Sequence, residues 1–222
     1  MAGIQMVSAG GVVIAGPEEA HNPLQVSVEP GAGNWYRYSG FTGTIGAALA
    51  ANSEVLQFRF VSGTKSFALV HKIIFDGIGI VAAATAASPI GFYATVARAW
   101  TAAGSGGTRI AMTGDNLQME TADPNSQVND IGIATTGALT AGTKTLDANG
   151  IGQAIGGVGT GLITIYGGTC VIPTQPIFDA TNLHPMVLAN QEGFAIRTTH
   201  AGPAGLTYVA GFTVYWREVT AF

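Results

Sequence analysis

Near its C-terminus the chain reads Gly205-Leu-Thr-Tyr-Val-Ala-Gly-Phe-Thr-Val-Tyr-Trp-Arg-Glu-Val219. From Leu206 onward the even positions are apolar or aromatic, whereas the odd positions include threonine and arginine. A period of two places alternate side chains on opposite faces of a β-strand. We therefore predict a long strand whose even face lies in the core, formed by Leu206, Tyr208, Ala210, Phe212, Val214 and Trp216.

A second stretch with the same pattern lies just upstream. Within residues 185–198, Phe194 and Ile196 alternate with Ala195 and Arg197, and the break at residues 201–205 contains glycine and proline. Such a break is typical of a β-hairpin connection. Because two strands this apolar cannot stand alone in water, we predict that they form a pair that packs against a second sheet.

Earlier stretches supply the remaining strands. Residues 54–60 and 67–75 flank a turn sequence and are expected to form another strand pair, and residues 91–100 continue the pattern. The glycine-rich residues 150–161 are interpreted as a long mobile loop, with strand character resuming at residues 162–166. About eight to ten strands without a convincing helix predict an all-β, jelly-roll-like β-sandwich of antiparallel strands.

The first fifty residues differ from the rest. Glycine, alanine and proline interrupt short apolar patches at residues 12–14 and 24–28. We predict an N-terminal arm or small β-lobe over residues 1–50, extended in character, and the sandwich domain over residues 51–222.

Composition limits the classes of partner. Charged residues form only 10% of the chain, against about 25% in an average soluble domain. So few charges favour a surface covered by copies of the chain or by partners. The net charge is −4 and lysine and arginine are not clustered, which argues against direct binding of nucleic acid.

No apolar run is long enough for a spanning helix, and the N-terminus lacks a signal-peptide pattern, so we expect synthesis in the cytoplasm and no membrane partner.

The sequence contains no convincing catalytic or metal-binding motif. The four histidines are scattered, without the spacing that aims two ligands at one ion. Cys170 lies in an apolar context and is interpreted as an inert thiol. One calcium-like pattern remains as an alternative to a solvated loop, although it lacks the turn glycine and the closing glutamate: Asp123, Asn125, Gln127 and Asn129. We predict no enzyme activity and no cofactor.

Three aromatic residues fall within four positions at Trp35, Tyr36 and Tyr38. Aromatic residues in such a cluster form a subunit contact, part of the core, or a platform for carbohydrate or bases. We take the three as candidate anchors of an interface, with a place in the core as the alternative.

Three longer stretches resemble a group of small structural proteins encoded by tailed bacteriophages. They are Thr108 to Gln118, which ends in the Leu-Gln of a Leu-Gln-Met sequence, residues 130–148, which begin Asp-Ile-Gly-Ile-Ala-Thr-Thr-Gly, and residues 184–197 ahead of the terminal Val-Tyr-Trp-Arg-Glu-Val. The resemblance covers roughly residues 54–219, and the N-terminal fifty residues lie outside it.

The resemblance implies a jelly-roll protein of the capsid decoration, or cement, type. Such a protein would be a homotrimer on the outer capsid surface of the virion, where it binds the major capsid protein and stabilises the shell without catalysis. No active-site residues come with the resemblance. Two alternatives stay open: a neck, tail or fibre component that contacts the host surface, and a carbohydrate-binding jelly-roll module that uses Trp35, Tyr36 and Tyr38.

Overall fold

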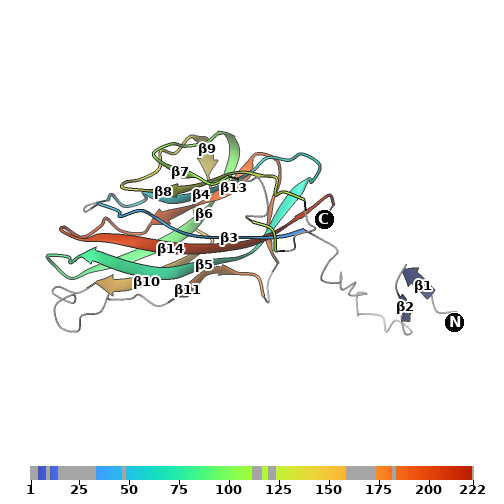
Figure 1. Ribbon diagram of the computed structural model, residues 1–222, viewed down its shortest axis with the longest axis horizontal. Coiled ribbons are helices and arrows are strands. Elements are labelled where there is room, and N and C mark those ends of the chain that lie inside the picture. Colours follow the sequence, from blue (N-terminus) through green and yellow to red (C-terminus); the bar gives the residue numbers. More distant parts are fainter. Residues whose placement is uncertain are drawn as a thin grey trace. The chain divides into compact units, whose positions relative to one another are not determined.

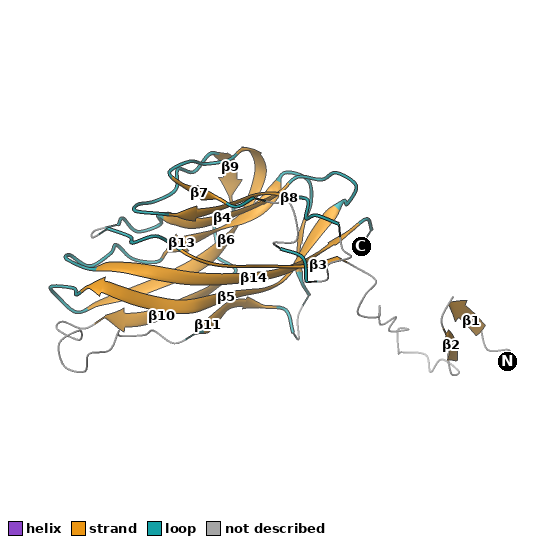
Figure 2. Ribbon diagram, viewed as in Figure 1, coloured by secondary structure: helices purple, strands orange, loops and turns teal. Residues whose placement is uncertain are grey.

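A computed structural model describes residues 5–8, 11–14, 34–46, 49–111, 117–119, 124–158, 174–181 and 184–221. The chain divides into two compact units, Met1–Ala32 and Gly33–Phe222. In the first unit, β1 (Gln5–Ser8) and β2 (Gly11–Ile14) form an antiparallel hairpin. The described residues form strands, turns and loops and no helix (Figure 2). Accordingly, none of them belongs to a helix that could cross a membrane.

The second unit consists of two antiparallel sheets. A five-stranded sheet has the order β11-β5-β14-β3, with β12 also paired to β5, and a seven-stranded sheet has the order β10-β6-β13-β4-β8-β7, with β9 also paired to β6 (Figure 1). The strand bounds are β3 (Asn34–Phe41), β4 (Glu54–Phe60), β5 (Phe67–Ala82), β6 (Ser88–Ala102), β7 (Gly107–Arg109), β8 (Val128–Ala134), β9 (Thr143–Leu146), β10 (Gly152–Val158), β11 (Gln175–Asp179), β12 (Met186–Leu188), β13 (Glu192–Thr198) and β14 (Thr207–Val219).

The strand pairing is nested in the manner of a jelly roll. Strand β3, the first of the sandwich, pairs with β14, the last, and β4 pairs with β13. Further in, β5 pairs with β11 and β12, and β6 pairs with β10. The predicted all-β, jelly-roll-like sandwich is therefore confirmed. The strand number exceeds the expected eight to ten because β7, β9 and β12 are only three or four residues long, too short to show an alternating pattern.

The predicted core face of β14 is also confirmed. Leu206, which directly precedes β14, and the even positions of the strand from Tyr208 to Trp216 are all buried. Their aromatic rings meet the opposite sheet: Trp216 packs edge-on against Phe58 of β4 with ring centroids 5.0 Å apart, and Phe212 packs edge-on against Phe92 of β6 at 5.3 Å. Edge-to-face pairs at this separation are favourable beyond the area that they bury.

Two of the predicted strand pairs are wrong. Residues 192–198 and 207–219 do not form a hairpin, since β13 lies in the seven-stranded sheet and β14 in the five-stranded sheet. Strands β4 and β5 are likewise divided between the two sheets. Each connection crosses from one sheet to the other. Alternation shows that a strand has one buried face, but both sheets of a sandwich bury a face in the same core.

The interpretation of residues 150–161 as a loop is wrong for most of that stretch. Residues 152–158 form β10, an edge strand that pairs with β6. Glycine allows the two sheets to approach here, because a Cβ on Gly152 would collide with the carbonyl oxygen of Ile177 in β11. The predicted strand at 162–166 and Cys170 lie outside the described residues.

The sandwich also begins before the predicted boundary at residue 51. Strand β3 pairs with β14, and the compact unit starts at Gly33. Residues 34–46, which the sequence analysis placed in an arm or lobe, therefore belong to the sandwich.

The core position of β14 leads to a stability prediction. Phe212→Ala or Trp216→Ala removes a large buried ring, and each should lower the free energy of unfolding by about 3–5 kcal/mol through lost transfer energy and a residual cavity. Arg217→Ala, on the opposite face of the same strand, should cost less than about 1 kcal/mol. Chemical denaturation of the three variants measures this difference. Equal, small losses in all three would contradict the assignment of faces.

Candidate functional site

The structure separates the three aromatic residues that were taken as interface anchors. Tyr36 and Tyr38 are buried in the core. Tyr36 stacks on Trp216 at 5.6 Å between ring centroids, and its hydroxyl donates to the carbonyl oxygen of Pro124 at 2.8 Å. Trp35 lies on the outer face of the five-stranded sheet and is only partly buried. The alternation along β3 produces this division, because neighbouring residues of a strand point to opposite faces.

The ring of Trp35 is contacted by two further side chains of the outer face. Its centroid lies 4.7 Å from that of His71 in β5 and 5.2 Å from the guanidinium carbon of Arg217 in β14. Such a cation–π contact is favourable at this distance. Burial, and then the positive charge of Arg217, lower the pKa of His71. The neutral form of His71 is therefore favoured next to the arginine.

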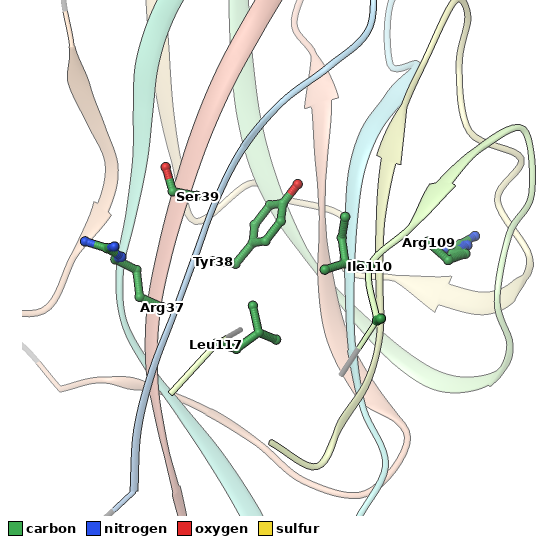
Figure 3. A pocket seen from close by; sticks show the side chains of 7 residues that line it. Arg37, Tyr38, Ser39, Arg109, Ile110 and Leu117 are labelled. Carbon is green, nitrogen blue, oxygen red and sulfur yellow. The ribbon is translucent and has the colours of Figure 1, made fainter. Parts of the chain in front are cut away.

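A hollow of about 350 Å³ lies between β3 and the segment that follows β7. Tyr38, Ile110 and Leu117 point towards its middle, whereas Arg37 and Arg109 point to opposite sides (Figure 3). Arg109 is already bound to Asp130 at 3.0 Å. The two cations therefore do not converge on one ligand position, and the hollow does not have the character of an anion site.

The middle of the outward face of the seven-stranded sheet is covered by the chain itself, whereas Ile155 on its edge strand β10 is 45% exposed. Gln57, Ala195 and Thr95 form a row across β4, β13 and β6 on this face, and all three are buried. Trp100 lies over the neighbouring row, since a Cβ on Gly193 would be 3.0 Å from its ring. Segment 139–146, which includes β9, completes the cover through the backbone hydrogen bond from Leu139 to the carbonyl oxygen of Glu54 at 2.8 Å.

A cluster of charged and polar side chains holds this cover in place. Lys144 of β9 donates to Glu54 Oε2 at 2.8 Å, and its side chain is only 1% exposed. The amide of Gln57 donates to the same Glu54 oxygen at 2.6 Å and to the carbonyl oxygen of Thr140 at 2.7 Å. Arg109 joins the cluster by donating to Gln57 Oε1 at 3.2 Å. Burial lowers the pKa of Lys144, and the hydrogen bond with Glu54 opposes that shift.

On the outer face of the five-stranded sheet, in contrast, large apolar side chains of the described residues are exposed. Phe41 at the end of β3 is 68% exposed, and Val81 near the end of β5 is 58% exposed. Gly211 and Gly79 lie between them, and a Cβ on Gly79 would meet nothing within 4 Å. The ring of Phe41 lies over Gly211. We call Phe41, Val81, Gly79 and Gly211 the apolar patch. Phe41 and Val81 are the two most exposed large apolar side chains of the described residues, and contiguous exposed apolar surface can mark a contact site.

Sequence reasoning missed the apolar patch, although a signal was present. The alternation that begins at Trp35 continues through Arg37 and Ser39 to Phe41. Once Tyr36 and Tyr38 are assigned to the core, the same period puts Phe41 on the opposite face. Val81 gave no such signal. A register shift between Thr207 and Tyr208 of β14 interrupts the strand pairing beside Val81, so simple alternation does not extend to this residue.

A buried carboxylate was also missed. Glu218 lies near the end of β14 and is 1% exposed. It accepts hydrogen bonds from the Ser126 hydroxyl at 2.6 Å, the backbone of Gln127 at 2.9 Å and the indole of Trp216 at 3.1 Å. These bonds satisfy a charge that would otherwise be costly to bury. Glu218 therefore fixes the segment that leads into β8, which is a structural role.

The remaining candidate residues do not come together. No group of three or more metal-ligating side chains occurs among the residues that the structure describes. In the calcium-like pattern, Asn125 and Gln127 lie in the described segment that begins at residue 124, whereas Asp123 lies outside the described residues. Gln127 instead accepts from the backbone of Lys65 at 2.9 Å through its side-chain oxygen. His21 also lies outside the described residues.

No protein family model, curated protein or solved structure that was compared with the chain matches it.

The buried tyrosines predict how stability depends on pH. Burial raises the pKa of Tyr38 and of Tyr208 from the usual 10.0 to about 12. Between these values the unfolded chain ionises both phenols while the folded chain keeps them protonated, so stability falls as pH rises. Below pH 10.0 the two groups contribute no pH dependence.

We therefore expect the free energy of unfolding to fall from about pH 10 towards pH 12, and to fall less steeply in Tyr208→Phe. Urea unfolding at a series of pH values measures both slopes. An unchanged slope in Tyr208→Phe would show that this phenol ionises equally in the two states.

Proposed function

We propose that the protein is a non-enzymatic phage virion structural protein of the capsid decoration (cement) type. In this proposal a homotrimer binds the major capsid protein on the outer surface of the capsid and stabilises the shell. The apolar patch carries the proposal, because it holds the two most exposed large apolar side chains of the described residues, Phe41 and Val81. The resemblance of residues 54–219 to phage structural proteins supports the same function.

The outward faces of the two sheets differ in how far they are covered, and this difference indicates which face would contact a partner. The middle of one outward face is closed by residues 139–146 and their polar contacts, whereas the other face exposes Phe41, whose ring lies over Gly211, and Val81. A flat partner surface can approach such a glycine-floored face closely. Phe41 and Val81 then replace Trp35, Tyr36 and Tyr38 as the proposed anchors. Phe41 is an aromatic residue of the kind that dominates binding energy at interfaces.

The carbohydrate-binding alternative loses its aromatic platform. Tyr36 and Tyr38 are buried in the core, and the ring of Trp35 is contacted by His71 and Arg217. A sugar ring needs an accessible aromatic face, and the three residues do not present a shared one.

Binding to the capsid tests the role of the apolar patch. Burying a phenylalanine side chain contributes about 1.5–3 kcal/mol, so Phe41→Asp should weaken binding to particles that lack the protein by about ten- to hundredfold. Ile155→Asp is the matched control, because Ile155 is 45% exposed but lies on β10 of the other sheet. Cosedimentation with capsids measures both. Equal binding by wild type and Phe41→Asp would exclude the patch as the contact.

The stabilising role is tested on particles. Particles without the protein should assemble but release their genome at lower temperature or under milder osmotic shock than complete particles. Adding back the wild-type protein should restore resistance, and Phe41→Asp should not. Equal robustness of the two kinds of particle would exclude the cement function and favour a neck, tail or fibre role, which binding of the protein to host cells would then test.

The oligomeric state is a separate expectation. So few charged residues, 10% of the chain, favour a surface that is partly covered by copies, and closed symmetry is the usual form of such an assembly. We expect light scattering of the purified protein to return the mass of a trimer. A monomer mass at micromolar concentration would contradict this part of the proposal.

A further inference from the structure

A lysine amine and a glutamine amide meet at one carboxylate under the cover of the seven-stranded sheet. Lys144 Nζ lies 2.8 Å from Glu54 Oε2, and Gln57 Nε2 lies 2.6 Å from the same oxygen. Gln57 is fully buried, and the side chains of Lys144 and Glu54 are 1% and 6% exposed. A nucleophile, an amide and a proton carrier are therefore held together away from solvent.

The surroundings of the amide match the needs of acyl transfer. Arg109 donates to the amide oxygen, Gln57 Oε1, at 3.2 Å, where negative charge develops when an amide carbon is attacked. The ring of Trp100 lies 4.3 Å from Lys144 Nζ and helps to exclude water. Burial lowers the pKa of Lys144, which increases the fraction of neutral amine, the nucleophilic form.

We propose that Lys144 and Gln57 form an intramolecular isopeptide bond, with Glu54 as the proton carrier. The neutral amine of Lys144 attacks Gln57 Cδ and forms the new C–N bond, while Arg109 stabilises the oxyanion on Oε1. Glu54 takes a proton from Lys144 Nζ and passes it to Gln57 Nε2. The bond between Cδ and Nε2 then breaks and ammonia leaves. The product is a secondary amide, and the reaction needs no oxidant, reductant or other reactant.

The bond would join two distant parts of the sandwich. It links β4, inside the seven-stranded sheet, to β9, a short strand that pairs with β6 in the same sheet and belongs to segment 139–146. The chain has a single cysteine and so cannot form an intrachain disulfide. A cross-link that closes a long loop restricts the unfolded chain in the same way as a disulfide. This inference does not depend on the proposed function.

Mass spectrometry of the denatured wild-type protein tests the proposal. We expect an intact mass lower than the sequence mass by one ammonia, and a proteolytic fragment in which the peptide of Lys144 is joined to that of Gln57. Lys144→Arg should have its full sequence mass, because arginine keeps the positive charge but cannot form the amide. Glu54→Gln should keep the full mass as well, since it lacks the proton carrier. An uncross-linked wild-type protein with the full sequence mass would overturn the proposal even if neither variant folded.

One other reaction loses ammonia and needs its own control. The exposed Asn149-Gly150 sequence can form a succinimide with the same change in mass. In Asn149→Ser the loss should persist if it comes from the cross-link. A loss that disappears in Asn149→Ser, or that fragmentation assigns to residue 149, would overturn the proposal.

Discussion

The sandwich depends on the position of β14 between β3 and β5. Strand β14 pairs with β5 along its whole length and with β3 from Gly211 to Glu218. Its buried rings reach across the core to Phe58 and Phe92 of the other sheet. Because β14 is the last strand and β3 the first of the sandwich, this pairing closes the whole nested arrangement. Contacts of such long sequence separation form slowly and depend on the rest of the chain being in place.

Three buried charged residues fix segments that lie against the sandwich. Lys144 and Glu54 hold the cover of the seven-stranded sheet, and Glu218 fixes the segment that leads into β8. Such buried charges are tolerable only because each has several hydrogen-bond partners. Lys144 and Glu54 belong to the seven-stranded sheet and Glu218 to β14 of the five-stranded sheet, so both sheets use a buried charge to hold a neighbouring segment.

The apolar patch gives the strongest basis for a binding role. Phe41 and Val81 are exposed on a sheet face where Gly79 and Gly211 have no side chains. If the proposed isopeptide bond forms, the opposite sheet is also locked to its cover. The protein would then combine a rigid, covalently closed side with an apolar side available to a partner, which suits a passive structural role.

The core was partly predictable from sequence and the candidate site was not. Alternation placed Phe212 and Trp216 in the core, because one buried face is a property of a single strand. The same reasoning could not tell whether Tyr36 and Tyr38 belong to the core or to an interface. Nothing local to Lys144, Gln57 or Glu54 indicated that they meet, since the first is far from the other two in the sequence.

The sequence by itself therefore determined the all-β class, the jelly-roll type and the buried face of β14. Tertiary structure alone decided which sheet each strand joins, that residues 152–158 form the edge strand β10, and that Phe41 and Val81 are exposed on the same sheet face. The physical reason is that side-chain alternation is a local property with a period of two. Strand partnership, in contrast, is set by hydrogen bonds between residues that are distant in the chain, and both sheets bury their apolar faces in one core.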